Sequence, residues 1–386
     1  MMYDFSYNHP INVHFGKTAL NHLAEEVQKA GSKVMLVYGG GSIKRNGVYD
    51  QITGALKEAG IDWVDFGGNV KPWYAEVLKA VDIAKREKVD CVIGIGGSTC
   101  MDMAKVIAYG AANDGIDLWD YISGKKERLP GCLRIGAIPT YPSGGSETGK
   151  GAIVDDEETG ANGTLYGFIP DFSIINPEFA YSLDAKSTAY GAVITLMQIS
   201  LNYFTGDSPI SERLIEGLID TIRDSVKIAI ADPKNYEARA NQALASIYGT
   251  NAIPSLGKSR EWVYNVYDYI GIIRRQLGIS YRETFSIIFP YWLQAEAEYH
   301  GEEIKNYMVK IWGVDANLPE KEACAEGAKR IIAFYESLGL PMKYNLVAKK
   351  PMPSREELIK ATEAEYYSNM MPMEKIVAMY ESCMDL

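Results

Sequence analysis

Short β-branched runs alternate with helical patterns between residues 30 and 176. In the intervening segments apolar residues recur three or four positions apart, which is the spacing of amphipathic helices. Strands separated by helices in this rhythm indicate a parallel sheet with crossover helices. The predicted strands are Lys33–Tyr38, Ile61–Phe66, Val89–Ile95, Leu133–Ile138 and Ser173–Ile175, and the predicted helices include Tyr49–Ala59, Tyr74–Glu87 and Met101–Ala111.

Beyond Pro177 the pattern becomes almost entirely helical. Asp184 has the residue type of a helix N-cap and marks the start of this half. We therefore predict an α/β domain over residues 1–180 and an all-α domain over residues 181–386, with a small-molecule cleft between them. The predicted helices of the second half are Asp184–Phe204, Pro209–Ala231, Tyr236–Tyr248, Arg260–Leu277 and Tyr281–Tyr299.

Composition and charge narrow the possible partners. The 386 residues are 47% hydrophobic and carry a formal net charge of -11, which would repel the phosphates of nucleic acid and anionic membrane. The longest apolar stretches, such as Phe285–Trp292, are far shorter than the roughly 20 residues that span a bilayer. We expect a small-molecule substrate, no nucleic acid and no membrane.

The cysteines and the N-terminal residues bear on location and assembly. Five scattered cysteines fit neither a disulfide framework nor a metal-binding pair, and the first residues resemble no secretion signal. We expect a cytoplasmic protein. Residues Asn8–Phe15 predict an additional strand or edge hairpin, whose free edge could pair with a second subunit to form a homodimer.

A glycine-rich turn joins the strand Val89–Ile95 to the following helix. Glycines let the backbone approach a diphosphate, and the first N–H groups of a helix point toward anionic oxygens. A tight turn that uses glycine only to save space is the alternative. Phosphate binding is favoured because Asp102 and Lys105 lie one helical turn apart and can face the same crevice. The residues expected to bind a coenzyme here are Gly96, Gly97, Ser98, Asp102 and Lys105.

Two more loops follow predicted strands and complete the expected coenzyme site. In many NAD-preferring sites, a carboxylate placed just beyond a strand accepts hydrogen bonds from the hydroxyls of the adenosine ribose. Gly39 occupies that place here, with the Ser42 hydroxyl and the Lys44 ammonium nearby. This pocket could hold a 2′-phosphate, so we expect NADP(H) to be preferred over NAD(H). The residues of this loop are Gly39, Gly40, Gly41, Ser42 and Lys44. The third loop contributes Thr140, Ser143 and Ser146 from the other side of the crevice.

Together, these loops in this order resemble those of the iron-containing alcohol dehydrogenase family, and the 39–44 loop resembles its NADPH-dependent aldehyde reductase and butanol dehydrogenase branch. The resemblance covers nearly the whole chain. It implies a dehydroquinate synthase-like fold, with a dinucleotide-binding N-terminal domain and a helical C-terminal domain. It also implies a divalent ion, held by one Asp and three His, that polarises the carbonyl of an aldehyde during hydride transfer.

The residues at the four implied ligand positions are not those of the family. They are Ile194, Gln198, Asn265 or Tyr267 (depending on a short gap), and Tyr281. The only histidines of the chain are His9, His14, His22 and His300, and none are spaced as a ligand pair. We therefore expect no tightly bound transition metal, although oxygen donors such as Asp268 and Glu283 leave weak binding of Mg²⁺ or Ca²⁺ open.

Two functions are consistent with a coenzyme site that lacks these metal ligands. The first is a metal-independent NAD(P)H oxidoreductase for an aldehyde, ketone or other small acceptor, in which a hydroxyl of Tyr267, Tyr269 or Tyr281 replaces the ion as the electrophile. Tyr264 clusters with these three around the aligned ligand positions. We assign catalytic roles to Tyr267, Tyr281 and Asp102, although a chain with 26 tyrosines places several in any pair of helices. The second is a catalytically silent dinucleotide-binding homologue, acting as a sensor or structural subunit.

Overall fold

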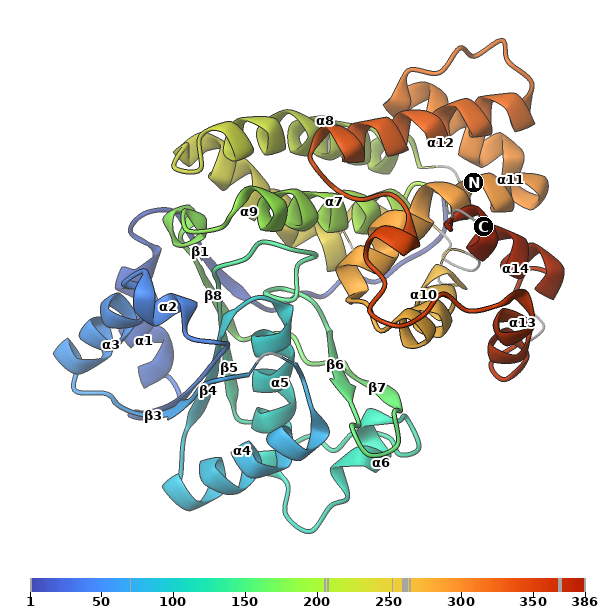
Figure 1. Cartoon of the computed structure of the whole chain (residues 1–386). Coiled ribbons are helices and arrows are strands. Elements are labelled where there is room, and N and C mark those ends of the chain that lie inside the picture. The colour runs from blue at the N-terminus through green and yellow to red at the C-terminus, as the bar shows by residue number, and fades with distance from the viewer. Residues whose placement is uncertain are drawn as a thin grey trace. The chain divides into compact units, whose positions relative to one another are not determined.

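The computed structural model describes residues 2–69, 71–204, 206, 208–251, 253–258, 263, 265–366 and 370–384. The chain divides into two compact units (Figure 1). An α/β unit comprises Tyr7–Leu183 and Asp232–Asn251, and a helical unit comprises Met1–Ser6, Asp184–Ala231 and Ala252–Leu386. The junction at Leu183 lies close to the predicted boundary. The helix within 232–251 differs from the prediction, because it packs with the α/β unit although its sequence neighbours on both sides are helical.

The α/β unit is built on a six-stranded parallel sheet in the order β1-β8-β5-β4-β2-β3. Its strands are β1 (Asn12–Phe15), β2 (Lys33–Tyr38), β3 (Asp62–Phe66), β4 (Cys91–Gly96), β5 (Arg134–Pro139) and β8 (Phe172–Ile175). Every residue of β4 is buried, as expected of a central strand covered on both faces. The strand predicted over Asn8–Phe15 is shorter, and it is an edge strand that pairs with β8.

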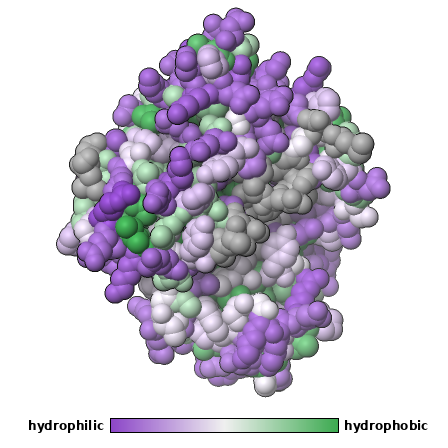
Figure 2. Space-filling model, turned by 90° about the vertical axis from the view of Figure 1, so that its right-hand side faces the viewer, coloured by the Kyte–Doolittle hydropathy of each residue, from purple (hydrophilic) through white to green (hydrophobic). Residues whose placement is uncertain are grey.

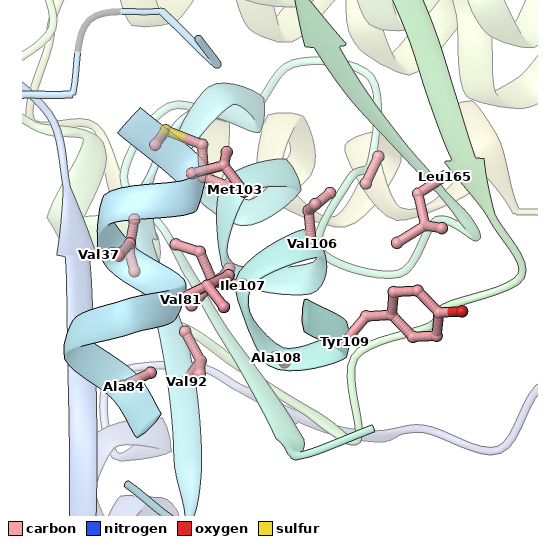
Figure 3. Close-up of a cluster of buried hydrophobic side chains, with 14 of the residues drawn as sticks. Val37, Val81, Ala84, Val92, Met103, Val106, Ile107, Ala108, Tyr109 and Leu165 are labelled. Atoms are coloured by element: carbon pink, nitrogen blue, oxygen red, sulfur yellow. The ribbon is translucent and has the colours of Figure 1, made fainter. Parts of the chain in front are cut away.

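Helices cover both faces of this sheet. One face packs against α4 (Tyr74–Glu87) and α5 (Ser98–Ala112), whose side chains meet Val37 of β2 and Val92 of β4 in the core drawn in Figure 3. The other face packs against α1 (Leu23–Gln28) and α3 (Val48–Glu58). The unit also contains α2 (Ser42–Arg45), α6 (Leu118–Ile122), α9 (Tyr236–Thr250) and the short 3-10 helices η1 (Ala19–His22) and η2 (Pro177–Ala180).

A two-stranded antiparallel hairpin was not predicted. It consists of β6 (Gly151–Asp155) and β7 (Asn162–Tyr166). Ala152, Val154 and Leu165 point into the core beside α5, whereas Ile153 and Tyr166 are exposed. The hairpin therefore extends the core that covers α5 and carries the chain away from the third predicted loop.

The helical unit contains most of the long helices. Asp184 is the N-cap of the first, because its carboxylate accepts a hydrogen bond from the Ser187 N–H. The long helix α11 departs from helical geometry at His300, well beyond Pro290. The helices are α7 (Ala185–Leu201), α8 (Pro209–Ala231), α10 (Asn265–Leu277), α11 (Tyr281–Trp312), α12 (Glu320–Ser337), α13 (Arg355–Glu363) and α14 (Met373–Ser382), with η3 (Ile253–Ser255) and η5 (Tyr344–Leu346).

Within the described residues, no helix has the length and apolar character needed to cross a membrane. Figure 2 shows hydrophilic residues over much of one face of the molecule, with apolar residues scattered among them. Single exposed apolar residues of this kind are normal on protein surfaces.

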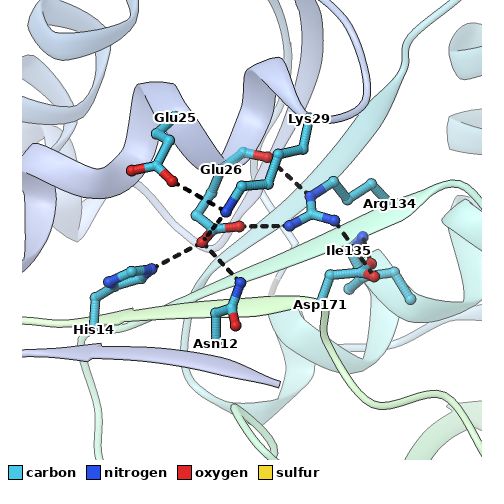
Figure 4. A network of polar contacts seen from close by, with 8 residues as sticks. All are labelled: Asn12, His14, Glu25, Glu26, Lys29, Arg134, Ile135 and Asp171. Carbon is cyan, nitrogen blue, oxygen red and sulfur yellow. Dashed lines mark hydrogen bonds and ion pairs between the residues drawn. The ribbon is translucent and has the colours of Figure 1, made fainter. Parts of the chain in front are cut away.

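A buried carboxylate ties α1 to the sheet (Figure 4). Glu26 is 1% exposed and accepts hydrogen bonds from Asn12, Lys29 and Arg134, and its Oε1 lies 3.0 Å from His14 Nε2. Burial acts to raise the pKa of Glu26, but the hydrogen bonds from these partners outweigh it and lower the pKa to about 2. The ionised group is therefore favoured in the folded state.

Glu26→Gln should lower the free energy of unfolding at pH 7 by about 3 kcal/mol, because Arg134 loses its buried anion. The folded-state pKa of Glu26 lies below its ordinary value of 4.5, so its contribution is present above about pH 4.5 and is lost as the pH falls toward 2. Urea unfolding at several pH values should show the difference between the variant and the wild type shrinking over this range. Glu25→Gln, at an exposed neighbour, is the control. An equal loss in both variants would contradict this account.

Candidate functional site

The first glycine loop joins β4 to α5 in the α/β unit. A Cβ built on Gly94 would lie 2.6 Å from Met101 Cα, and one on Gly96 would lie 2.9 Å from Cys100 Sγ. Gly94 and Gly96 therefore do save space, as the alternative interpretation held. Gly97 is the N-cap of α5 with extended backbone, and Ser98, the first helical residue, is exposed. The first N–H groups of α5 have no partner within the helix, so this end suits an anion.

The other two loops lie at the same edge of the sheet. Because β2, β4 and β5 are adjacent and parallel, their carboxyl ends and the loops that follow them are neighbours. The Thr140 N–H donates to the Gly96 carbonyl over 2.9 Å, which joins the third loop to the first. Ligands of open α/β sheets bind at this edge.

The expected coenzyme-binding residues of these two loops differ in exposure. Gly40 is exposed, and Gly41 adopts the left-handed conformation (φ 85°) as N-cap of α2. Ser42 is also exposed, and Lys44 is 47% exposed. In the third loop Thr140 and Ser146 are buried, whereas Ser143 is partly exposed.

Asp102 and Lys105 point into the protein. The Asp102 carboxylate accepts from Ser146 Oγ over 2.5 Å and from the Ile153 N–H over 3.2 Å. The Lys105 ammonium is fully buried and donates to four acceptors within 2.9–3.1 Å, all of them on residues 146–151. Lys105 therefore fixes the third loop. Burial raises the pKa of Asp102 and lowers that of Lys105.

Glu147 and helix α9 complete the support of the third loop, and the sequence did not indicate this role. Glu147 is 1% exposed, and its Oε1 accepts from Ser246 Oγ of α9 over 2.7 Å. A Cβ on Gly145 would lie 2.3 Å from the Ser246 carbonyl oxygen, so glycine is needed for α9 to approach the loop. Burial raises the pKa of Glu147. The closely spaced Gly145 and Gly149 are the signal that could have indicated this contact.

In the helical unit, three of the positions aligned with the family's metal ligands form one cluster. The Gln198 side chain of α7 and the Tyr267 hydroxyl are both close enough to the Tyr281 hydroxyl, at the start of α11, to affect its pKa. Phe285 lies beside both tyrosines, with ring centroids 5.9 Å from Tyr267 and 5.7 Å from Tyr281. Burial raises the pKa of Tyr281 well above its ordinary value, so its hydroxyl is neutral near pH 7.

The remaining tyrosine candidates separate from this cluster. Tyr269 is fully buried. Its hydroxyl accepts a hydrogen bond from the Met371 N–H, and its carbonyl accepts one from the Tyr380 hydroxyl, so its contacts stabilise the helical unit. Tyr264 lies outside the described residues. Ile194 and Asn265 are buried on α7 and α10.

The donor set of the Gln198–Tyr281 cluster does not suit the ion that the family implies. Iron or zinc sites use imidazole, thiolate or carboxylate ligands, whereas this cluster offers one amide and two neutral phenols. Within the described ranges, no group of three or more His, Cys, Asp or Glu side chains is placed to hold a metal ion. Glu283, considered earlier as an oxygen donor, instead completes the capping box of α11 with Ser280. Gln198 Oε1 is buried and has no hydrogen-bond partner among the described residues.

Residues 10–177 match the profile of iron-containing alcohol dehydrogenases, and residues 199–383 match that of the family's C-terminal domain. The chain therefore belongs to the iron-containing alcohol dehydrogenase family. These matches confirm the resemblance and the predicted fold class.

Individual relatives support this family assignment. NADH-dependent butanol dehydrogenase A of Clostridium acetobutylicum is 32% identical over 350 residues, covering 89% of this chain and 88% of the relative. NADPH-dependent aldehyde reductase YqhD of Escherichia coli is 28% identical over 348 residues, covering 88% of each. The crystal structure of NADH-dependent butanol dehydrogenase A from Thermotoga maritima superposes with a TM-score of 0.89 at 29% identity, covering 100% of this chain and 99% of that one.

Lys105→Met should lower the free energy of unfolding by about 3 kcal/mol, because four buried acceptors lose their donor. It should also weaken NADPH binding at least tenfold, because the third loop loosens. Urea unfolding and fluorescence titration measure the two effects, and Lys125→Met, at an exposed position, is the control. Full stability combined with lost binding would instead indicate that Lys105 contacts the phosphate directly.

Proposed function

We propose that this chain is an NAD(P)H-dependent oxidoreductase that interconverts a small aldehyde or ketone and the corresponding alcohol. The observation that carries the proposal is the N-terminal end of α5, where Gly97 and Ser98 offer backbone N–H groups at the carboxyl edge of the sheet. These groups would hold the diphosphate of the coenzyme, with the 39–42 loop on the adenosine side. The bound nicotinamide would supply the hydride.

In this proposal, hydroxyl groups of the chain polarise the carbonyl group of the substrate. The Tyr281 hydroxyl is neutral near pH 7 and lies close to the Gln198 side chain, and we expect its O–H to donate to the carbonyl oxygen of the substrate. Gln198 Oε1, which has no partner among the described residues, could accept from the alcohol form. An alcohol hydroxyl both donates and accepts hydrogen bonds, so Gln198 and Tyr281 together could bind it without a metal ion. The rings of Tyr267 and Tyr281 both lie beside Phe285.

The preference for NADP(H) is part of this proposal. Glycine at position 39 leaves no carboxylate directly after β2, and Ser42 and Lys44 can meet a 2′-phosphate. Relatives named for NADH and for NADPH both occur, so the family alone does not fix the choice. Relatives named as dehydrogenases and reductases favour an active enzyme over a silent homologue.

Assembly and location are also proposals. The outer edge of β1 has no strand partner in the described sheet, and Val13 and Phe15 on this strand are exposed. A second copy pairing there would cover both side chains and the free edge. All five cysteines are free thiols, which suits a reducing cytoplasm.

Protein purified with a chelator should oxidise NADPH in the presence of a suitable small carbonyl compound. Tyr281→Phe should lower kcat about 10²-fold through loss of the donor, with the Kd for NADPH unchanged. Tyr299→Phe, at an exposed position of the same helix, is the control. Stoichiometric iron or zinc by elemental analysis, or full activity of Tyr281→Phe, would contradict the metal-independent mechanism. NADPH binding without turnover on aldehydes, ketones and quinones would support the silent homologue.

Sedimentation velocity should give a dimer at micromolar concentration, and Val13→Asp should shift it toward monomer by placing a charge on the edge strand. Tyr166→Asp, which alters an exposed side chain on β7, should leave the dimer intact. A monomeric wild type would rule out the dimer.

A further inference from the structure

Lys44 is held in an aromatic and acidic setting on the α/β unit. Its ammonium lies 5.0 Å from the ring centroid of Tyr38 and 4.4 Å from that of Tyr49, both within the range of a cation–π interaction. It also lies 4.0 Å from Asp65 Oδ2, the same oxygen that accepts a 2.7 Å hydrogen bond from the Tyr49 hydroxyl.

This arrangement lies at the edge of the sheet where the adenosine half of a coenzyme would lie. Tyr38 ends β2, and Asp65 is the penultimate residue of its parallel neighbour β3. The loops that follow the two strands are joined by a hydrogen bond from the Gly68 N–H to the Gly39 carbonyl. In sheets of this kind the adenosine ribose is recognised by side chains just beyond the strand next to the diphosphate loop.

Asp65 and a coenzyme 2′-phosphate would compete for the same cation. The Lys44 and Asp65 side chains are 47% and 37% exposed, so water screens their attraction and Lys44 can exchange partners. A 2′-phosphate bound by Lys44 would still feel repulsion from the Asp65 carboxylate, whereas the 2′-hydroxyl of NADH would not.

We propose that Asp65 is a specificity-determining residue, which holds Lys44 at the 2′ position of the coenzyme and limits the preference for NADP(H) over NAD(H). The inference rests on the proposed function, because it requires a nicotinamide coenzyme at these loops. It adds that discrimination is set by the Lys44–Asp65 pair as well as by the missing carboxylate at position 39. Removing the carboxylate therefore strengthens binding of one coenzyme only.

The test is fluorescence titration of the full chain with NADH and NADPH. Asp65→Asn keeps the size of the side chain and should tighten NADPH binding three- to tenfold while changing the Kd for NADH less than twofold. Lys44→Met should weaken NADPH binding at least tenfold with a small effect on NADH. Asp62→Asn, at the exposed opposite end of β3, carries the same change of charge and should alter neither. The gain in Asp65→Asn should shrink as salt is raised.

The possible outcomes separate the two proposals. The role of Asp65 is overturned if Asp65→Asn changes the Kd for both coenzymes equally. It is also overturned if neither Kd changes while the wild type binds NADPH. Both results leave the proposed function intact. The same gain in Asp62→Asn reduces the effect to net charge and also overturns it. A wild type that binds neither coenzyme contradicts the proposed function and this inference together. Circular dichroism of each variant identifies a failure to fold.

Discussion

The close approach of α5 to β4 is the contact on which the rest of the candidate site depends. Gly94 and Gly96 have no Cβ, so the first turn of the helix lies directly against the last residues of the strand. This contact presents the N–H groups of Gly97 and Ser98 at the carboxyl edge of the sheet. Two turns along the same helix, Lys105 reaches four acceptors of the third loop. One helix therefore both presents the anion site and fixes the loop beside it.

The two units contribute differently to the candidate site. In the α/β unit, buried polar groups of α5 and α9 reinforce the loop proposed to bind the coenzyme. In the helical unit, the family resemblance aligns Gln198 and Tyr281 with metal-ligand positions, and Gln198 is close enough to Tyr281 to affect its pKa. Amide and phenol groups are directional donors and acceptors without net charge, so they can orient a substrate oxygen but supply no strong Lewis acid. In the proposed mechanism, such a site would stabilise a developing oxyanion by hydrogen bonding alone.

Local patterns were sufficient to predict the parallel sheet, the helix Tyr74–Glu87 and the N-cap Asp184, because each depends on the residues within a few positions of it. They could not show that α9 packs against the third loop, since helical periodicity identifies an apolar face and not its partner. They also could not show that Lys105 is fully buried, because a spacing of three residues puts two side chains on one face without showing whether that face meets solvent or protein. The clustering of Gln198 with Tyr281 was expected only from the family resemblance.

The most direct test of the central claim is isothermal titration calorimetry of metal-free protein with NADPH and with NADH. We expect saturable heat with one coenzyme bound per chain, and much weaker binding in Gly97→Asp, where a carboxylate would oppose the diphosphate at the start of α5. No heat with either coenzyme, or binding unaffected by Gly97→Asp, would contradict it.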